Sequence, residues 1–298
     1  MTTVLAHKGS IPIRLWWASI RPFSLGTSVF PVLFGTSLAI KAGFPLRIGV
    51  LFLTLLIAVL THVATNLTNS LYDWVSGHDQ PASPQAVPIL RDCPHGELLV
   101  RRALTILALC TACIAVLFAY YTSWPMIIWP IVGYLGGIYY TKPPIAYKHK
   151  GLSLPGVFLL MGMILPMVSF GAQTAFVNWR LALLCLPLAL LVTAILAANE
   201  LRDCLDDATA GSITFTVRCG ERCGTALFGL LITLPYLCIP ISVVWLSLPA
   251  STLLVYLTLP LVTALTTSLT RQEFSGLDLL TARLHGGFCL IYTISLFL

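Results

Sequence analysis

The sequence contains few charged residues. Only 9% of its 298 residues are Asp, Glu, Lys or Arg, whereas a typical soluble domain has roughly 25%. Its 17 basic and 11 acidic side chains are too few to cover a soluble surface of this size. This scarcity excludes a cytosolic globular enzyme, a nucleic-acid-binding protein and a disordered chain. Because hydrophobic residues make up 57% of the chain, the sequence predicts a polytopic membrane protein.

Long runs without charge indicate where the membrane spans lie. Residues 103–141 form a run of 39 residues, about 58 Å of helix at about 1.5 Å per residue. That is twice a bilayer core of about 30 Å, so the run must hold two spans. The same argument divides the 48 uncharged residues of 223–270. We expect an all-α bundle of about nine transmembrane helices. Each of the two long runs holds two of them, with breaks near 121–125 and 247–251. The other five lie at residues 22–40, 48–72, 155–179, 180–199 and 279–298.

The basic residues predict the orientation. With the N-terminus in the cytoplasm, 14 of the 17 Lys and Arg residues fall in the leader or in cytoplasmic loops. Only Lys41, Arg47 and Arg180 face outward. This asymmetry agrees with the positive-inside rule and supports the count of nine spans. We therefore expect an integral, multi-pass protein with a cytoplasmic N-terminus, which in a bacterium would lie in the plasma membrane.

Acidic residues are rare outside two places. Nine of the 11 lie in the cytoplasmic loops after the second and sixth predicted spans. Each group begins with Asn-x-x-x-Asp, and residues i and i+4 share one face of a helix. An amide and a carboxylate are therefore presented together at each helix end, followed by a further carboxylate. The first motif is Asn69, Asp73 and Asp79, and the second is Asn199, Asp203 and Asp207.

The spacing of the two motifs indicates an internal repeat. Their Asn residues are 130 positions apart, and each ends an even-numbered span. We expect one transmembrane domain, residues 1–298, with two quasi-repeated halves at about 15–141 and 151–298. Membrane proteins of this kind often place a site between the halves.

Both motifs suit Mg²⁺, which prefers hard oxygen ligands and is usually held by a few carboxylates and a shared phosphate. Two facing clusters would hold two or more Mg²⁺ ions around a diphosphate. The alternative is that these side chains only cap helices at the membrane surface.

A basic loop lies between the motifs. Lys142, Lys148 and Lys150 occur within about ten residues, with no acid to balance them. They are candidate ligands of a diphosphate. They are equally candidates for topology determinants that contact anionic lipid.

With these residues in hand, the chain resembles the UbiA superfamily of intramembrane prenyltransferases, and within it the 1,4-dihydroxy-2-naphthoate prenyltransferases of menaquinone synthesis. The resemblance extends from Arg21 to about Gly220. It rests on four segments: RPFSLGTSVFPVLFGTSLA at 21–39, ATNLTNSLYDWVSGHD at 64–79, YYTKPPIAYKHKGL at 139–152 and NELRDCLDDATAGSITFTVRCG at 199–220.

The resemblance implies a bundle of nine helices around a central cavity that opens laterally to lipid. It also implies a polyprenyl diphosphate bound through two or more Mg²⁺ ions, and transfer of the prenyl group to an aromatic acceptor. By position, the resemblance assigns the metal to Asn69, Asp73, Asp79, Asn199, Asp203 and Asp207, the diphosphate to Lys148, Arg202 and Arg21, and the reacting end of the chain to Tyr140.

The sequence departs from the family pattern at several positions around these motifs. Ser70 and Glu200 replace the Asp and Asn that usually follow the two motif Asn residues, and Ser212 replaces a Lys. In the basic loop, Ser153 replaces a Gly and Leu154 an acid. These departures keep open a terpene cyclase that ionises and cyclises farnesyl or geranylgeranyl diphosphate without an acceptor. A more remote alternative is a cation transporter that uses the Asp clusters as ion sites.

Overall fold

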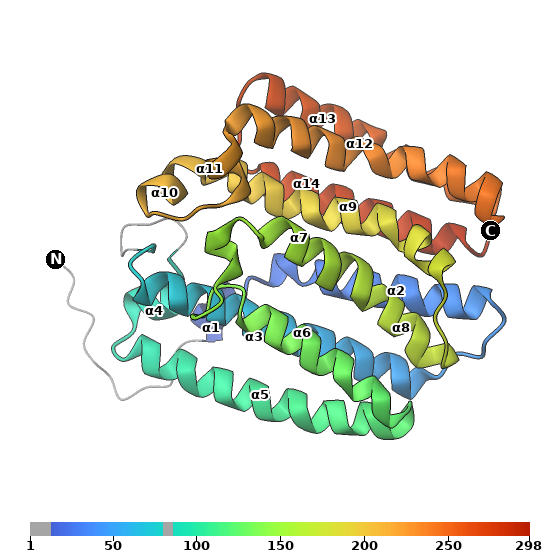
Figure 1. Ribbon diagram of the computed structural model, residues 1–298, viewed down its shortest axis with the longest axis horizontal. Coiled ribbons are helices and arrows are strands. Elements are labelled where there is room, and N and C mark those ends of the chain that lie inside the picture. The colour runs from blue at the N-terminus through green and yellow to red at the C-terminus, as the bar shows by residue number, and fades with distance from the viewer. Residues whose placement is uncertain (1–12, 80–85) are drawn as a thin grey trace.

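The computed structural model describes residues 13–79 and 86–298, and in these ranges it contains helices and no strands (Figure 1). Residues 1–12 of the N-terminal leader, including Lys8, whose cytoplasmic location is predicted above, lie outside the described residues. The helices are α1 (Ile13–Ser19), η1 (Pro22–Ser24), α2 (Gly26–Lys41), α3 (Ile48–Val75), α4 (Pro88–Asp92), α5 (Gly96–Tyr121), η2 (Trp124–Ile127), α6 (Ile128–Ile138), η3 (Tyr147–Lys150), α7 (Ser153–Val157), η4 (Phe158–Ile164), α8 (Leu165–Thr174), α9 (Trp179–Arg202), α10 (Cys204–Thr209), α11 (Phe215–Cys219), α12 (Glu221–Leu246), η5 (Ala250–Thr258), α13 (Leu259–Thr270) and α14 (Leu277–Ser295).

The helices confirm the all-α class, whereas the count of nine spans stays a prediction. Among the described residues, 7 helical segments are long and apolar enough to cross a membrane. The segment Trp124–Ile138 is apolar but shorter, and α14 carries Asp278, Arg283 and His285. Both predicted breaks occur, because α5 ends at Tyr121 and α12 ends at Leu246.

Close helix packing joins the early and late parts of the chain. α2 packs against both α8 and α14, and α9 packs against α12 and α14. A Cβ atom at Gly35 of α2 would overlap the backbone carbonyl of Pro166 in α8, so only glycine permits this approach. Gly162 of η4 lies equally close to the backbone of Ala189 in α9.

The core of the bundle lies between α2, α9, α12 and α14. Phe34 and Tyr292 are fully buried there, with their ring centroids 4.6 Å apart. Helix α9 begins where the Asn178 side chain accepts a hydrogen bond from the Leu181 backbone N–H. The short helices α4, α10 and α11 gather at one end of the bundle, on the left in Figure 1. α3 and α9 both finish at this end, which brings the two acidic motifs to the same end of the molecule.

Candidate active site

One large cavity runs through the bundle beside α3 and α9. It has a volume of about 990 Å³, at the upper end of the range of about 300–1,000 Å³ for small-molecule sites. Thr54 and Asp73, both on its wall, are 19 residues apart on α3, which is about 28 Å along the helix axis. The cavity therefore extends across most of a bilayer core.

The cavity is polar at one end and apolar at the other. At the end with the short helices, its wall includes both Asn-x-x-x-Asp motifs, Asp79, Asp207, Lys148 and Arg202. Further along, the wall is formed by side chains such as Ile57, Phe118, Leu160 and Val168. This division suits a ligand with a charged head and a long hydrocarbon chain.

Helix geometry explains how α3 reaches the cavity. Asn69 and Asp73 are four residues apart, and Thr65 and His62 continue the same face toward the apolar end. His62 is held by Ser28, whose Oγ lies 2.7 Å from Nδ1, and by Ser24, whose Oγ lies 3.2 Å from Nε2. This polar face is therefore fixed by contacts with the segment that begins α2.

Asp73 is paired with the basic loop. Its side chain is nearly buried, and its Oδ2 accepts a hydrogen bond from Lys148 Nζ at 2.7 Å. The same ammonium donates to Asn69 Oδ1 at 3.3 Å. Asp73 Oδ1 lies 3.3 Å from His149 Nε2, a contact that satisfies the ion-pair distance without forming a hydrogen bond. Two cationic or ionisable side chains of η3 thus surround the first motif carboxylate.

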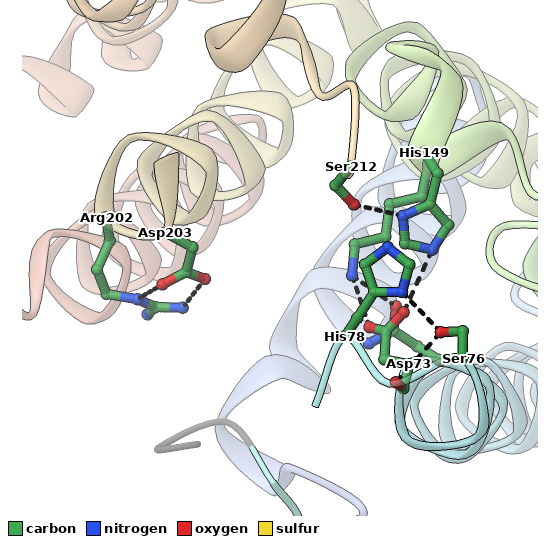
Figure 2. A network of polar contacts seen from close by, with 9 residues as sticks. Asp73, Ser76, His78, His149, Arg202, Asp203 and Ser212 are labelled. Atoms are coloured by element: carbon green, nitrogen blue, oxygen red, sulfur yellow. Dashed lines mark hydrogen bonds and ion pairs between the residues drawn. The ribbon is translucent and has the colours of Figure 1, made fainter. Parts of the chain in front are cut away.

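His149 connects three loops and was not among the residues predicted from the sequence. Its Nδ1 lies 2.5 Å from Ser212 Oγ, in the segment after α10. Its ring stacks on His78, with centroids 4.5 Å apart, and His78 is in turn 2.6 Å from Ser76 Oγ (Figure 2). Burial, and then the proximity of His149, lowers the pKa of His78, so this ring favours its neutral form. No sequence motif indicated this cluster, because its members come from three separated segments.

Asp203 is held at the end of α9. Arg202 donates from Nε to Asp203 Oδ1 at 2.7 Å and from Nη2 to Oδ2 at 2.8 Å. Its Nη1 also donates to Asp278 of α14. Figure 2 shows the Arg202–Asp203 pair and the cluster around Asp73 as two separate groups. The planar guanidinium therefore orients one motif carboxylate and ties α9 to α14.

The remaining acids of the motifs lie in polar but partly buried places. Burial raises the pKa of Asp207 to about 6. Burial, followed by the negative charge of Asp73, also raises the pKa of Asp79. Repulsion between carboxylates that share a cavity wall favours the arrival of a positive charge.

The donor set at this end fits Mg²⁺. Asn199 Oδ1 is buried and has no hydrogen-bond partner among the described residues. Within residues 13–79 and 86–298, no three His, Cys, Asp or Glu side chains are arranged to hold an ion by themselves. Mg²⁺ is usually bound by one or two carboxylates, with substrate phosphates and water completing the shell. The arrangement thus suits an ion shared with a phosphate ligand better than a closed protein site.

Tyr140 and Arg21 both lie on the cavity wall. The Tyr140 ring meets Tyr147 edge-on at 5.3 Å, and Tyr147 donates to the Gly136 carbonyl. Burial, and then the charge of Glu200, raises the pKa of Tyr140 well above its usual value, so the phenol remains protonated.

Lys142 and Lys150 lie away from the cavity, unlike Lys148. Lys142 follows the end of α6 and lines a separate hollow on the outside of the bundle. Lys150 is exposed and donates to the Pro144 carbonyl. Of the three lysines that the sequence could not distinguish, η3 brings only Lys148 to the motif residues.

Two positions at which the sequence departs from the family pattern contact each other. The buried carboxylate of Glu200 accepts a hydrogen bond from the Ser153 hydroxyl of α7. Its Oε2 accepts from the Thr216 backbone N–H of α11 at 3.2 Å. Glu200 lines the cavity and thus joins the end of α9 to α7 and α11. We call this group of three residues the Glu200 clasp.

The chain is similar to known proteins in both sequence and fold. Residues 28–275 match the model of the UbiA prenyltransferase family. The chain is 29% identical over 274 residues to UbiA prenyltransferase domain-containing protein 1 of Xenopus tropicalis, covering 90% of this chain and 77% of that protein. It is 32% identical over 237 residues to 1,4-dihydroxy-2-naphthoate octaprenyltransferase of Bacillus subtilis (strain 168), covering 75% and 72%. The structure of a UbiA homologue from Archaeoglobus fulgidus bound to GPP and Mg²⁺ superposes with a TM-score of 0.59 at 15% identity, covering 93% of this chain and 99% of that one.

The long apolar helices and the cavity with one charged end define an integral membrane protein built to hold an amphipathic ligand. The chain belongs to the UbiA prenyltransferase family. It is therefore a membrane-embedded prenyltransferase.

Proposed function

We propose that this chain uses Mg²⁺ to ionise a polyprenyl diphosphate and transfers the prenyl group to an aromatic acceptor of the naphthoate or hydroxybenzoate kind. The observation that carries the proposal is the single cavity that joins both acidic motifs to a long apolar wall. The naphthoate prenyltransferase relative supports the acceptor class, and the homologue solved with GPP and Mg²⁺ supports the donor and the ion.

Oxygen atoms from both motifs are the proposed metal ligands. These are Asp73, Asp79, Asp203 and Asp207, with Asn69 and Asn199 as neutral donors. When bound, two or more Mg²⁺ ions would supply the positive charge that makes diphosphate a good leaving group. Arg202 orients Asp203 for this role through its two hydrogen bonds.

Basic side chains act on the diphosphate itself. Lys148, Arg202 and Arg21 line the charged end of the cavity. As the bond between C1 of the prenyl chain and the diphosphate oxygen breaks, its electron pair leaves with the diphosphate. Fixed positive groups stabilise the charge that develops there, because they are already oriented before the reaction.

The apolar wall protects the allylic cation. Side chains such as Leu160 and Val168 exclude water, which would otherwise capture C1. The protonated phenol of Tyr140 presents an electron-rich ring to the positive charge. A ring carbon of the acceptor then forms the new bond to C1, and the acceptor releases one proton as its aromaticity returns.

The test uses the purified full-length chain in detergent with labelled polyprenyl diphosphates of several lengths. Each is incubated with and without Mg²⁺ and with and without 1,4-dihydroxy-2-naphthoate, followed by mass spectrometry of the organic extract. A prenylated naphthoate that forms only with both additions is the expected result. A terpene hydrocarbon or alcohol formed equally well without acceptor would establish the cyclase instead.

A matched pair of variants tests the metal ligands. Asp73→Asn should abolish diphosphate release, whereas Asp92→Asn should not. Asp92 also lies near the motif end, but it is exposed, pairs with Arg91 and is not on the cavity wall. Normal release from Asp73→Asn would refute the assignment.

We also propose that the end with both motifs faces the cytoplasm. Fourteen of the 17 basic residues support this orientation. In a background without other reactive thiols, Lys41→Cys should react with a membrane-impermeant maleimide in intact cells, and Glu273→Cys should react only after lysis. The reverse pattern would invert the topology.

A further inference from the structure

A second hollow lies on the outside of the bundle, between α3, α5 and α6. It has a volume of about 400 Å³ and shares no lining residue with the active-site cavity. α5 and α6 each pack against α3. We call this hollow the α3–α5–α6 groove.

Two cations lie at one end of the groove. Arg101 comes from the second turn of α5, and Lys142 follows the last turn of α6. Neither forms an ion pair with a carboxylate of the described residues, and the remaining ranges, 1–12 and 80–85, contain no Asp or Glu. By contrast, Arg91 of α4 is paired with its neighbour Asp92. The two groove cations are therefore available to an external anion.

The groove also has an unused hydroxyl. Thr68 of α3 lines it, is 1% exposed, and has no hydrogen-bond partner for its Oγ1 among the described residues. A buried polar atom without a partner costs free energy unless a ligand or water satisfies it. A ligand with acceptor oxygens would satisfy Thr68 and both cations together.

Apart from the cations and a few hydroxyl groups, most of the groove wall is apolar. Leu104 and Ala108 of α5 and Ile138 of α6 line it. Arg101 and Ala108 are seven residues apart on α5, which is about 10 Å along the helix axis. The flanking Ile106 and Leu109 are 61% and 63% exposed, so this side of α5 faces the hydrocarbon of the membrane.

We propose that the α3–α5–α6 groove binds one anionic phospholipid. Its phosphate lies between Arg101 and Lys142, and an acyl chain follows Leu104 and Ala108. Basic pockets between transmembrane helices select anionic headgroups in this way. The lipid lies against the side of α3 that faces away from the cavity. It contacts Thr68, the residue before Asn69. It thereby stabilises the helix that carries the first motif.

The experiment measures lipid retained by the purified full-length chain in native mass spectrometry, after incubation with mixed micelles containing either phosphatidylglycerol or phosphatidylcholine. The wild type should retain one phosphatidylglycerol in preference to phosphatidylcholine. Each groove cation is expected to contribute about fivefold to retention, so Arg101→Gln/Lys142→Gln should lose about 25-fold. Equal retention of the two lipids by the wild type would overturn the proposal.

A matched control separates a site from general surface charge. Arg102→Gln/Arg218→Gln removes the same two charges from exposed positions that do not line the groove. It should retain phosphatidylglycerol within twofold of the wild type. A loss as large as that of the groove variant would show that only diffuse charge attracts the lipid.

The acyl chain has its own test, with the cations left in place. Ala108→Trp fills the groove and should lower retention at least fivefold, whereas Leu109→Trp on the exposed face should not. Finally, inorganic phosphate and glycerophosphoglycerol are added as competitors. If either displaces phosphatidylglycerol at equal concentration, the groove binds a soluble phosphate group without needing the acyl chains, and the lipid proposal fails.

Discussion

The Glu200 clasp allows a quantitative test of how the end of α9 is held to α7 and α11. Glu200→Ala leaves two buried donors without an acceptor: the Ser153 hydroxyl and the Thr216 backbone N–H, which belong to residues 0% and 1% exposed. Hydrogen bonds to a charged acceptor contribute about 1.5–3 kcal/mol each. We therefore expect Glu200→Ala to lower the free energy of unfolding by about 3–6 kcal/mol. Glu200→Gln, which keeps one acceptor oxygen, should lose about half as much.

A double-mutant cycle isolates one of the two bonds. Ser153→Ala removes the hydroxyl and should cost about 1.5–3 kcal/mol in the wild type. In the Glu200→Ala background, the same substitution has no bond to remove and should cost nearly nothing. The coupling free energy between the two sites is then about 1.5–3 kcal/mol.

The assay is reversible unfolding in mixed detergent micelles, followed by circular dichroism. Thr209→Ala is the control, because its exposed hydroxyl bonds only to the nearby Asp206 carbonyl. It should change the free energy of unfolding by less than about 0.5 kcal/mol. If the Glu200 and Ser153 effects add to within about 0.5 kcal/mol, the clasp does not stabilise the fold and the reasoning is refuted.

Three further predictions concern the cavity and the packing around it. Lys148→Gln should weaken diphosphate binding about tenfold in an equilibrium assay. Arg102→Gln, which removes a charge outside the cavity, should leave diphosphate binding unchanged. Equal loss of binding in both variants would mean that only the total positive charge matters. Chelation of divalent ions should abolish turnover by the full-length chain, and added Mg²⁺ should restore it; full turnover in excess chelator would contradict the metal assignment. Gly35→Val should lower the thermal unfolding midpoint by several degrees, because the valine side chain would overlap the Pro166 carbonyl. Gly49→Ala should leave the midpoint unchanged, because a Cβ atom at residue 49 would meet no other atom.

Much of the architecture was predictable because it depends on local sequence. Charge-free runs indicated the spans and their two internal breaks, since a charged side chain in a bilayer core is costly. The i, i+4 spacing of Asn69 and Asp73 placed them on one face of α3, because helix geometry is the same everywhere. The two motifs each follow an even-numbered span, which also indicated that they end on the same side of the membrane.

Contacts between distant segments could not be obtained in this way. His149 meets Asp73, His78 and Ser212 only because three loops converge at one end of the bundle. Glu200 and Ser153 looked like unrelated departures from a family pattern, yet they form one hydrogen bond.

The sequence by itself determined a membrane-embedded helical protein with two acidic motifs at matching helix ends, because hydrophobicity and helical periodicity act over a few turns. Only the tertiary structure decided which basic side chains serve those motifs. Lys148 turns toward Asp73, whereas Lys142, six residues earlier, faces the outside of the bundle beside Arg101. The difference arises from the path of the chain between α6 and α7, which brings η3 against the motif residues Asn69 and Asp73 of α3 but leaves the end of α6 on the outer side.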